Sequence, residues 1–108
     1  MHTFIETPLF TRLVSEYLTD EEYAALQGAL VANPESGALI RGSGGLRKLR
    51  WRVAGRGKSG GARVIYYVRS RAGVIWMLTI YAKNEQESIP AHVLRKIAQE
   101  IDDGEGHA

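Results

Sequence analysis

Residues 62–82, ARVIYYVRSRAGVIWMLTIYA, contain two runs rich in β-branched and aromatic residues, separated by a short polar segment. Runs of this kind predict two β-strands, at 62–69 and 74–82, and a hairpin turn between them. The second run is almost entirely apolar, which indicates a strand in the middle of the sheet. Strict alternation along it puts Leu78 and Ile80 on one face and Tyr81 on the opposite face.

The preceding run, LRKLRWRV at 46–53, alternates apolar and cationic residues. This period of two predicts a third strand, with one face toward the core and one toward solvent. The apolar face carries Leu49, Trp51 and Val53, and the cationic face carries Lys48, Arg50 and Arg52. Three strands in succession at hairpin spacing predict an antiparallel sheet.

The rest of the chain predicts helices around this sheet. HTFIET suggests a short first strand, Pro8 begins a helix, and Thr19 or Asp20 caps a second helix that pairs with the first as a hairpin. Pro90 begins a last helix with an apolar stripe, and about 102–108 are predicted to fray. The predicted helices cover 9–17, 19–33 and 90–101, with a loop over 34–45. The whole chain, 1–108, is therefore predicted to be a single α+β domain, with helices mainly on one face of the sheet.

The glycine-rich segment GRGKSGGAR at 55–63 invites comparison with a nucleotide-binding loop. Such a loop needs a glycine five positions before its Gly-Lys-Ser and a helix directly after it. Arg52 stands at the glycine position, and a strand-forming run follows instead of a helix. We therefore interpret this segment as a turn between two strands.

Charge is divided unevenly along the chain. Residues 36–84 contain 11 of the 14 Lys and Arg residues, and all 12 Asp and Glu residues lie outside this window. A basic surface on a small domain is typical of proteins that bind nucleic acid, although it can also be a solvated face alone. The sequence has no Cys, so disulfides and zinc–thiolate sites are excluded. We expect no signal peptide, no membrane association, a cytoplasmic location, and neither a metal nor another cofactor.

The cations of neighbouring strands are predicted to converge on the sheet face that the helices leave open. Lys48, Arg50 and Arg63 would form a shallow basic patch there, with Tyr67 nearby. Such a patch suits single-stranded RNA, whose phosphates bind guanidinium groups and whose unstacked bases lie on aromatic rings.

Two blocks of the sequence, GSGGLRKLRWRVAGRGKSGGARVIYYV at 42–68 and LTIYAKNE at 78–85, resemble the RelE superfamily of bacterial toxins, in its HigB-like branch. The resemblance implies a small microbial-ribonuclease-like fold and endonucleolytic cleavage of mRNA, usually on the ribosome. It also implies a cognate antitoxin as partner, often one with a DNA-binding helix-turn-helix.

The resemblance assigns catalytic roles to Lys48 and Arg50 on the basic strand, to Arg63 at the start of the next strand, and to Lys83 after the last strand. Two positions depart from the pattern, because Asn84 and Ile89 stand where well-studied relatives have an arginine and a tyrosine. Further RNA contacts are predicted from six residues: Arg47, Arg52, Arg56, Lys58, Tyr67 and Tyr81.

The predicted chemistry uses the RNA 2′-OH as an internal nucleophile. Arg50 and Arg63 would bind the phosphate, because a guanidinium group offers two parallel donors. Neighbouring cations disfavour a further positive charge, so Lys48 could act as the base, with Lys58 or Lys83 as the acid. Two other interpretations stay open: a non-catalytic nucleic-acid-binding module that uses the same face, and a family member that only binds its partner.

Overall fold

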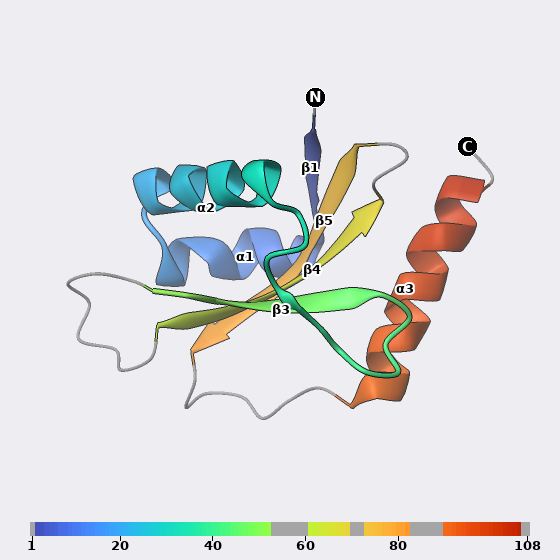
Figure 1. The fold of residues 1–108 in the computed structure, drawn as a ribbon. Helices are drawn as coiled ribbons and strands as arrows, with labels where there is room; N and C mark the ends of the chain where they lie inside the picture. The colour runs from blue at the N-terminus through green and yellow to red at the C-terminus, as the bar shows by residue number, and fades with distance from the viewer. Residues whose placement is uncertain (1, 53–60, 70–72, 83–89, 107–108) are drawn as a thin grey trace.

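The computed structural model describes residues 2–52, 61–69, 73–82 and 90–106. Five strands and three helices follow one another in these parts of the chain (Figure 1). In chain order they are β1 (Thr3–Glu6), α1 (Pro8–Tyr17), α2 (Asp20–Ala32), β2 (Ala38–Leu39), β3 (Leu46–Trp51), β4 (Ala62–Arg69), β5 (Val74–Ala82) and α3 (Ala91–Gly106). The α+β class, the N-terminal helical hairpin and the C-terminal helix are therefore confirmed.

The strands form one sheet in the order β1-β5-β4-β3-β2. β3, β4 and β5 are antiparallel neighbours, as predicted. β1 lies parallel to β5, so the sheet is mixed. β2 is a two-residue edge strand within the segment predicted to be a loop. This arrangement is consistent with a ribonuclease-like α+β fold.

Local side-chain contacts fix where the first two helices begin. The Thr7 side chain accepts a hydrogen bond from the Phe10 N–H at 3.0 Å, and Pro8 occupies the first turn of α1, where no N–H partner is needed. At α2, Thr19 and Glu22 form a capping box, in which each side chain accepts from the backbone N–H of the other. The helices therefore start within one residue of the predicted positions.

One face of the sheet is covered by α1 and α2. Phe10, Leu26 and Leu30 of these helices are fully buried against Val64 and Tyr66 of β4. Leu49 and Trp51 pack against the same cluster, which confirms the predicted apolar face of β3 at these two positions, while Val53 lies outside the described residues.

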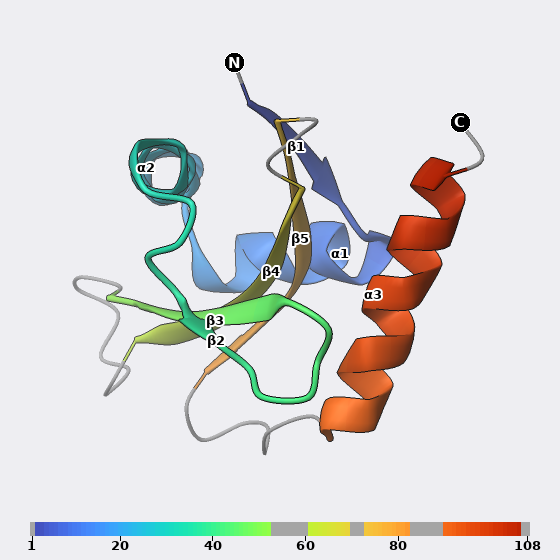
Figure 2. The same ribbon diagram turned by 45° about the vertical axis from the view of Figure 1, so that its right-hand side comes forward.

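The opposite face, which the helices were predicted to leave open, is covered in part by α3 (Figure 2), whereas α1 and α2 share the first face. Leu94 and Ala98 of α3 are buried against Leu46, Ile65 and Leu78 of the sheet. The physical reason is that this face also carries a large apolar area, which a third layer removes from water.

A β-bulge changes the predicted faces of β5. Ile65 pairs with Thr79 but Tyr66 pairs with Met77, so Leu78 is an extra residue in β5. Leu78 packs with the α3 cluster, whereas Ile80 packs with the α1–α2 cluster. Strict alternation, which placed Leu78 and Ile80 on one face, fails because an extra residue shifts the pattern by one.

The last helix extends beyond its predicted end at residue 101. α3 continues to Gly106, five residues further than predicted. Asp102 explains the extension, because its carboxylate accepts hydrogen bonds from the Tyr67 hydroxyl at 2.8 and 3.1 Å and forms an ion pair with Arg69. No helix in the described ranges is both long enough and apolar enough to cross a membrane.

Candidate nucleic-acid interface

Three cations project from one face of β3. Leu49 and Trp51 point into the α1–α2 core, so Lys48 and Arg50 point to the opposite face by alternation, and Arg52 directly follows the strand. Arg50 and Arg52 are exposed, and Lys48 is half-buried. The predicted cationic face of β3 is therefore present, and α3 leaves these side chains accessible.

The neighbouring strand adds a fourth cation. Arg63 of β4 lies directly opposite Arg50 in the antiparallel register, and Tyr81 of β5 lies opposite Arg63. Like charges directly opposite each other destabilise a sheet, so an anion bound between them would be stabilising. We call Lys48, Arg50, Arg52 and Arg63 the basic row.

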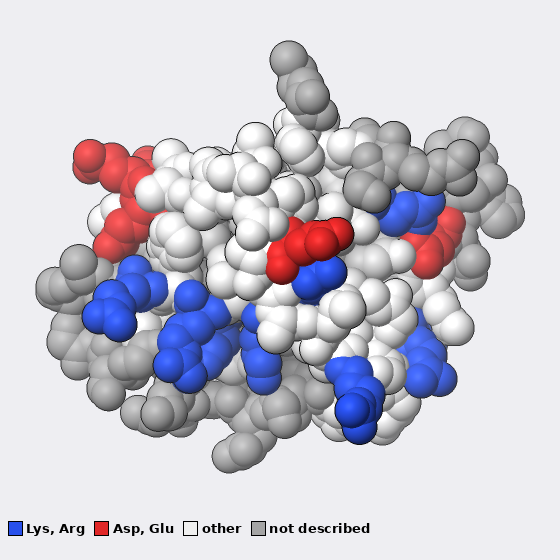
Figure 3. Space-filling view, in the orientation of Figure 1, with Lys and Arg blue, Asp and Glu red and all other residues white. Residues whose placement is uncertain are grey.

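Among the described residues, no Asp or Glu side chain forms an ion pair with a cation of the 48–52 segment. Within the described ranges, Lys48, Arg50 and Arg52 form no ion pair, whereas Arg69 is paired with Asp102. Strands β3, β4 and β5 contain no Asp or Glu. Figure 3 shows several Lys and Arg side chains in the lower half of the view, near β3, whereas acidic side chains lie at the upper left over α2 and, in the centre and at the right, beside other basic side chains. The three β3 cations thus present their charge to solvent.

The two tyrosines predicted to contact RNA are buried. Tyr67 is 8% exposed and Tyr81 is 5% exposed. Burial, together with the bond to Asp102, raises the pKa of Tyr67 above its usual range. Burial also raises the pKa of Tyr81, against the smaller effect of Arg63, which lowers it. Neither ring is presented to solvent as a surface on which a base could stack.

Arg47 is not brought to the basic row. It projects from the other face of β3, and its Nη1 donates to the carbonyl oxygens of Gly37 at 2.7 Å and Glu35 at 3.2 Å. Its described contacts therefore hold the segment between α2 and β2.

Arg56, Lys58 and Lys83 lie outside the described residues, as do Asn84 and Ile89. The strands on either side of the glycine-rich segment are described, and Trp51 of β3 pairs with Ala62 of β4. A strand, not a helix, follows that segment, which agrees with the interpretation against a nucleotide-binding loop.

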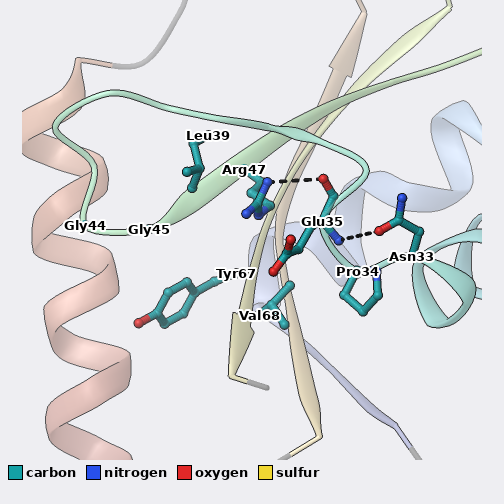
Figure 4. Close-up of a pocket in the computed structure, with 9 residues that line it drawn as sticks. All are labelled: Asn33, Pro34, Glu35, Leu39, Gly44, Gly45, Arg47, Tyr67 and Val68. Carbon is teal, nitrogen blue, oxygen red and sulfur yellow. Dashed lines mark hydrogen bonds between the residues drawn. The ribbon is translucent and has the colours of Figure 1, made fainter. Parts of the chain in front are cut away.

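Sequence reasoning missed a cleft at the end of the sheet where β3 begins. Its volume is about 420 Å³ (Figure 4). The lining residues are Asn33, Pro34, Glu35, Leu39, Gly44, Gly45, Arg47, Tyr67 and Val68. Glu35 could not be singled out from the sequence, because it lies in a loop outside the basic window. In the described ranges, no three His, Cys, Asp or Glu side chains are grouped closely enough to hold a metal ion.

No model of a known protein family matches this sequence. The resemblance to the RelE superfamily therefore rests on the quoted blocks alone. In the structure, LRKLRW forms β3 and ARVIYYVR forms β4, so these blocks supply the strands that carry the basic row.

Proposed function

We propose that this protein is the toxin of a bacterial type II toxin–antitoxin pair and acts as a metal-independent endoribonuclease on mRNA. The observation that carries the proposal is the basic row, in which Lys48, Arg50 and Arg52 have no acidic partner among the described residues and lie beside Arg63. Lys48, Arg50 and Arg52, with Arg63 beside Arg50, would offer several positive charges to the phosphate backbone of a single strand. The RelE-like blocks supply the reaction type.

The proposed reaction needs no metal. The 2′-oxygen attacks the adjacent phosphorus while Lys48 takes the 2′-OH proton. The bond from phosphorus to the 5′-oxygen breaks, and Lys58 or Lys83 gives that oxygen a proton. The products are a 2′,3′-cyclic phosphate and a 5′-OH. Arg50 and Arg63, opposite each other across β3 and β4, bind the phosphoryl oxygens as negative charge develops.

The same surface suits the proposed protein partner. An antitoxin with an acidic segment would neutralise the toxin by covering the basic row, because opposite potentials attract across interfaces. We propose that the substrate is mRNA on the ribosome and that the protein acts in the cytoplasm.

The test is to incubate the purified full chain with translating ribosomes and map new mRNA ends. We expect the wild type to produce ends, and Lys48→Met and Arg63→Gln to reduce cleavage by about 100-fold or more. Arg12→Gln is the matched control, since Arg12 is an exposed cation on α1. Undiminished cleavage by both row variants would refute the assignment.

A second candidate function is non-catalytic RNA binding through the same row. It needs only the positive charges of Lys48, Arg50 and Arg52 and no group that acts as a base or an acid. If this function is correct, the wild type binds RNA in the same experiment but produces no new mRNA ends.

A further inference from the structure

We propose that the Tyr81 hydroxyl recognises a ribose 2′-OH of the RNA strand that the basic row binds, and so makes the site select RNA over single-stranded DNA. This inference deepens the proposed function and rests on it. Tyr81 is then a specificity-determining residue, which contacts a nucleotide other than the one that reacts.

Tyr81 extends the line of cations across a third strand. Arg50 of β3 lies directly opposite Arg63 of β4, and Arg63 lies directly opposite Tyr81 of β5. Residues directly opposite each other project from the same face of a sheet and are close neighbours there. The face is the one that α3 covers in part, because Tyr81 packs with the α3 cluster. Two guanidinium groups and one phenol therefore project in a line across the sheet.

The ring of Tyr81 is buried, but its hydroxyl reaches the surface. The residue is 5% exposed and packs in the same cluster as Leu78 and Leu94. Its hydroxyl makes no hydrogen bond within the described ranges. Yet no side-chain oxygen or nitrogen in those ranges is both enclosed and without a hydrogen-bond partner. The accessible part of Tyr81 therefore includes its hydroxyl oxygen.

The hydroxyl is positioned by the buried ring and stays protonated at neutral pH. Burial raises the pKa of Tyr81 above its usual range, and the charge of Arg63 offsets only part of this rise. A neutral phenol has one hydrogen to donate and an oxygen that accepts. Because the ring is already ordered, a ligand that bonds to the hydroxyl loses little free energy to side-chain ordering.

The cations of the basic row do not by themselves distinguish RNA from DNA. Lys and Arg side chains donate hydrogen bonds and cannot accept them, so they suit phosphoryl oxygens, which both nucleic acids carry. The ribose 2′-OH has a hydrogen to donate, and deoxyribose lacks this group. The Tyr81 oxygen can accept that hydrogen. Tyr81 therefore adds an acceptor to a surface of donors.

The 2′-OH at Tyr81 belongs to a different nucleotide from the one at Lys48, the proposed base. Lys48 lies two residues from Arg50 along β3, and β4 separates β3 from β5. Strands rise by about 3.3 Å per residue and lie about 4.8 Å apart, so the backbones of Lys48 and Tyr81 are roughly 12 Å apart. Side chains that project from one face over this distance meet different nucleotides of a bound strand.

The test is a fluorescence-anisotropy titration of the full chain with two single-stranded oligonucleotides of one sequence. One is RNA, and the other has 2′-fluoro groups in place of every 2′-OH, which removes the hydrogen and keeps the charge. All proteins carry Lys48→Met, so that the RNA stays intact. We expect the RNA to bind about tenfold more tightly than its 2′-fluoro analogue. Equal binding of the two would overturn the inference.

Tyr81→Phe keeps the buried ring and removes only the hydroxyl. We expect it to weaken RNA binding about tenfold and to leave binding of the 2′-fluoro analogue unchanged. Thr79→Val is the matched control, because it removes another hydroxyl from the same face of β5, opposite Ile65 instead of a cation. The control is expected to keep the preference for RNA. A preference that survives in Tyr81→Phe would also overturn the inference.

Arg50→Gln separates this inference from the proposed function. It is expected to weaken binding of both oligonucleotides by the same factor, because Arg50 binds phosphate in either one. If Arg50→Gln weakens both but the parent protein binds them equally, the role of Tyr81 is overturned and the row stands. If Tyr81→Phe removes the preference but Arg50→Gln weakens neither, the role of the row is overturned. If neither oligonucleotide binds, both are overturned.

Discussion

The Tyr66 hydroxyl allows a sharp test of how the cleft is held together. Tyr66 is fully buried, and its hydroxyl bonds both the Gly37 N–H and the Pro34 carbonyl. Tyr66→Phe removes the oxygen and leaves the ring in place, so packing is nearly unchanged. Each lost bond costs about 0.5–1.5 kcal/mol, and a buried donor left without a partner costs about 1–3 kcal/mol. We therefore expect the free energy of unfolding to fall by about 2–4 kcal/mol.

The assay is urea denaturation of the full chain, in which the midpoint should fall while the m-value stays constant. Tyr81→Phe is the matched control, because Tyr81 is also buried but its hydroxyl makes no hydrogen bond within the described ranges. The control is expected to lose about 0.5 kcal/mol or less. A Tyr66→Phe variant that is no less stable than the control would refute this account of the cleft.

Three further predictions concern other contacts. Thr19→Ala removes the cap of α2 and should lower the free energy of unfolding by about 1 kcal/mol, measured by urea denaturation. Asp102→Ala removes the partner of Tyr67 and should speed amide hydrogen exchange in the last turns of α3, while a rate equal to wild type would contradict the proposed tie. The folded state raises the pKa of Tyr67 and Tyr81 above the ordinary value of 10.0, so it holds these protons longer than the unfolded chain. Stability should therefore be complete below about pH 10 and fall as pH rises further, which denaturation at pH 8 and pH 11 would show.

The predictions that succeeded depend on local patterns. The alternation of β3 identified the faces of Leu49 and Arg50, because a strand with one buried face and one exposed face alternates apolar and polar residues. The cap at Thr19 was visible because the capping box lies within four residues. Features that depend on residues close together in the chain can therefore be predicted from the sequence.

The predictions that failed depend on contacts between distant segments. The apolar stripe of α3 showed that the helix is packed, but not which face of the sheet receives it. The extra residue at Leu78 leaves no local mark, because β5 is apolar along its length except at Thr79, and an apolar run does not show which face each residue takes. The segment that carries Glu35 is held at the cleft by Arg47 and by the Tyr66 hydroxyl, which are 12 and 31 residues from Glu35 in the chain. The sequence therefore predicted the basic row but not the cleft.

The parallel pairing of β1 with β5 has a consequence for synthesis. The Thr7 hydroxyl donates to the Leu78 carbonyl at 2.7 Å across 71 positions of the chain. β1 is synthesised first, but it cannot pair until β5, the last strand, has been synthesised. Contacts between residues so far apart in the chain raise the contact order, which slows folding. A nascent chain that stops before residue 74 has β1 without its partner strand, so this domain can complete its sheet only late in translation.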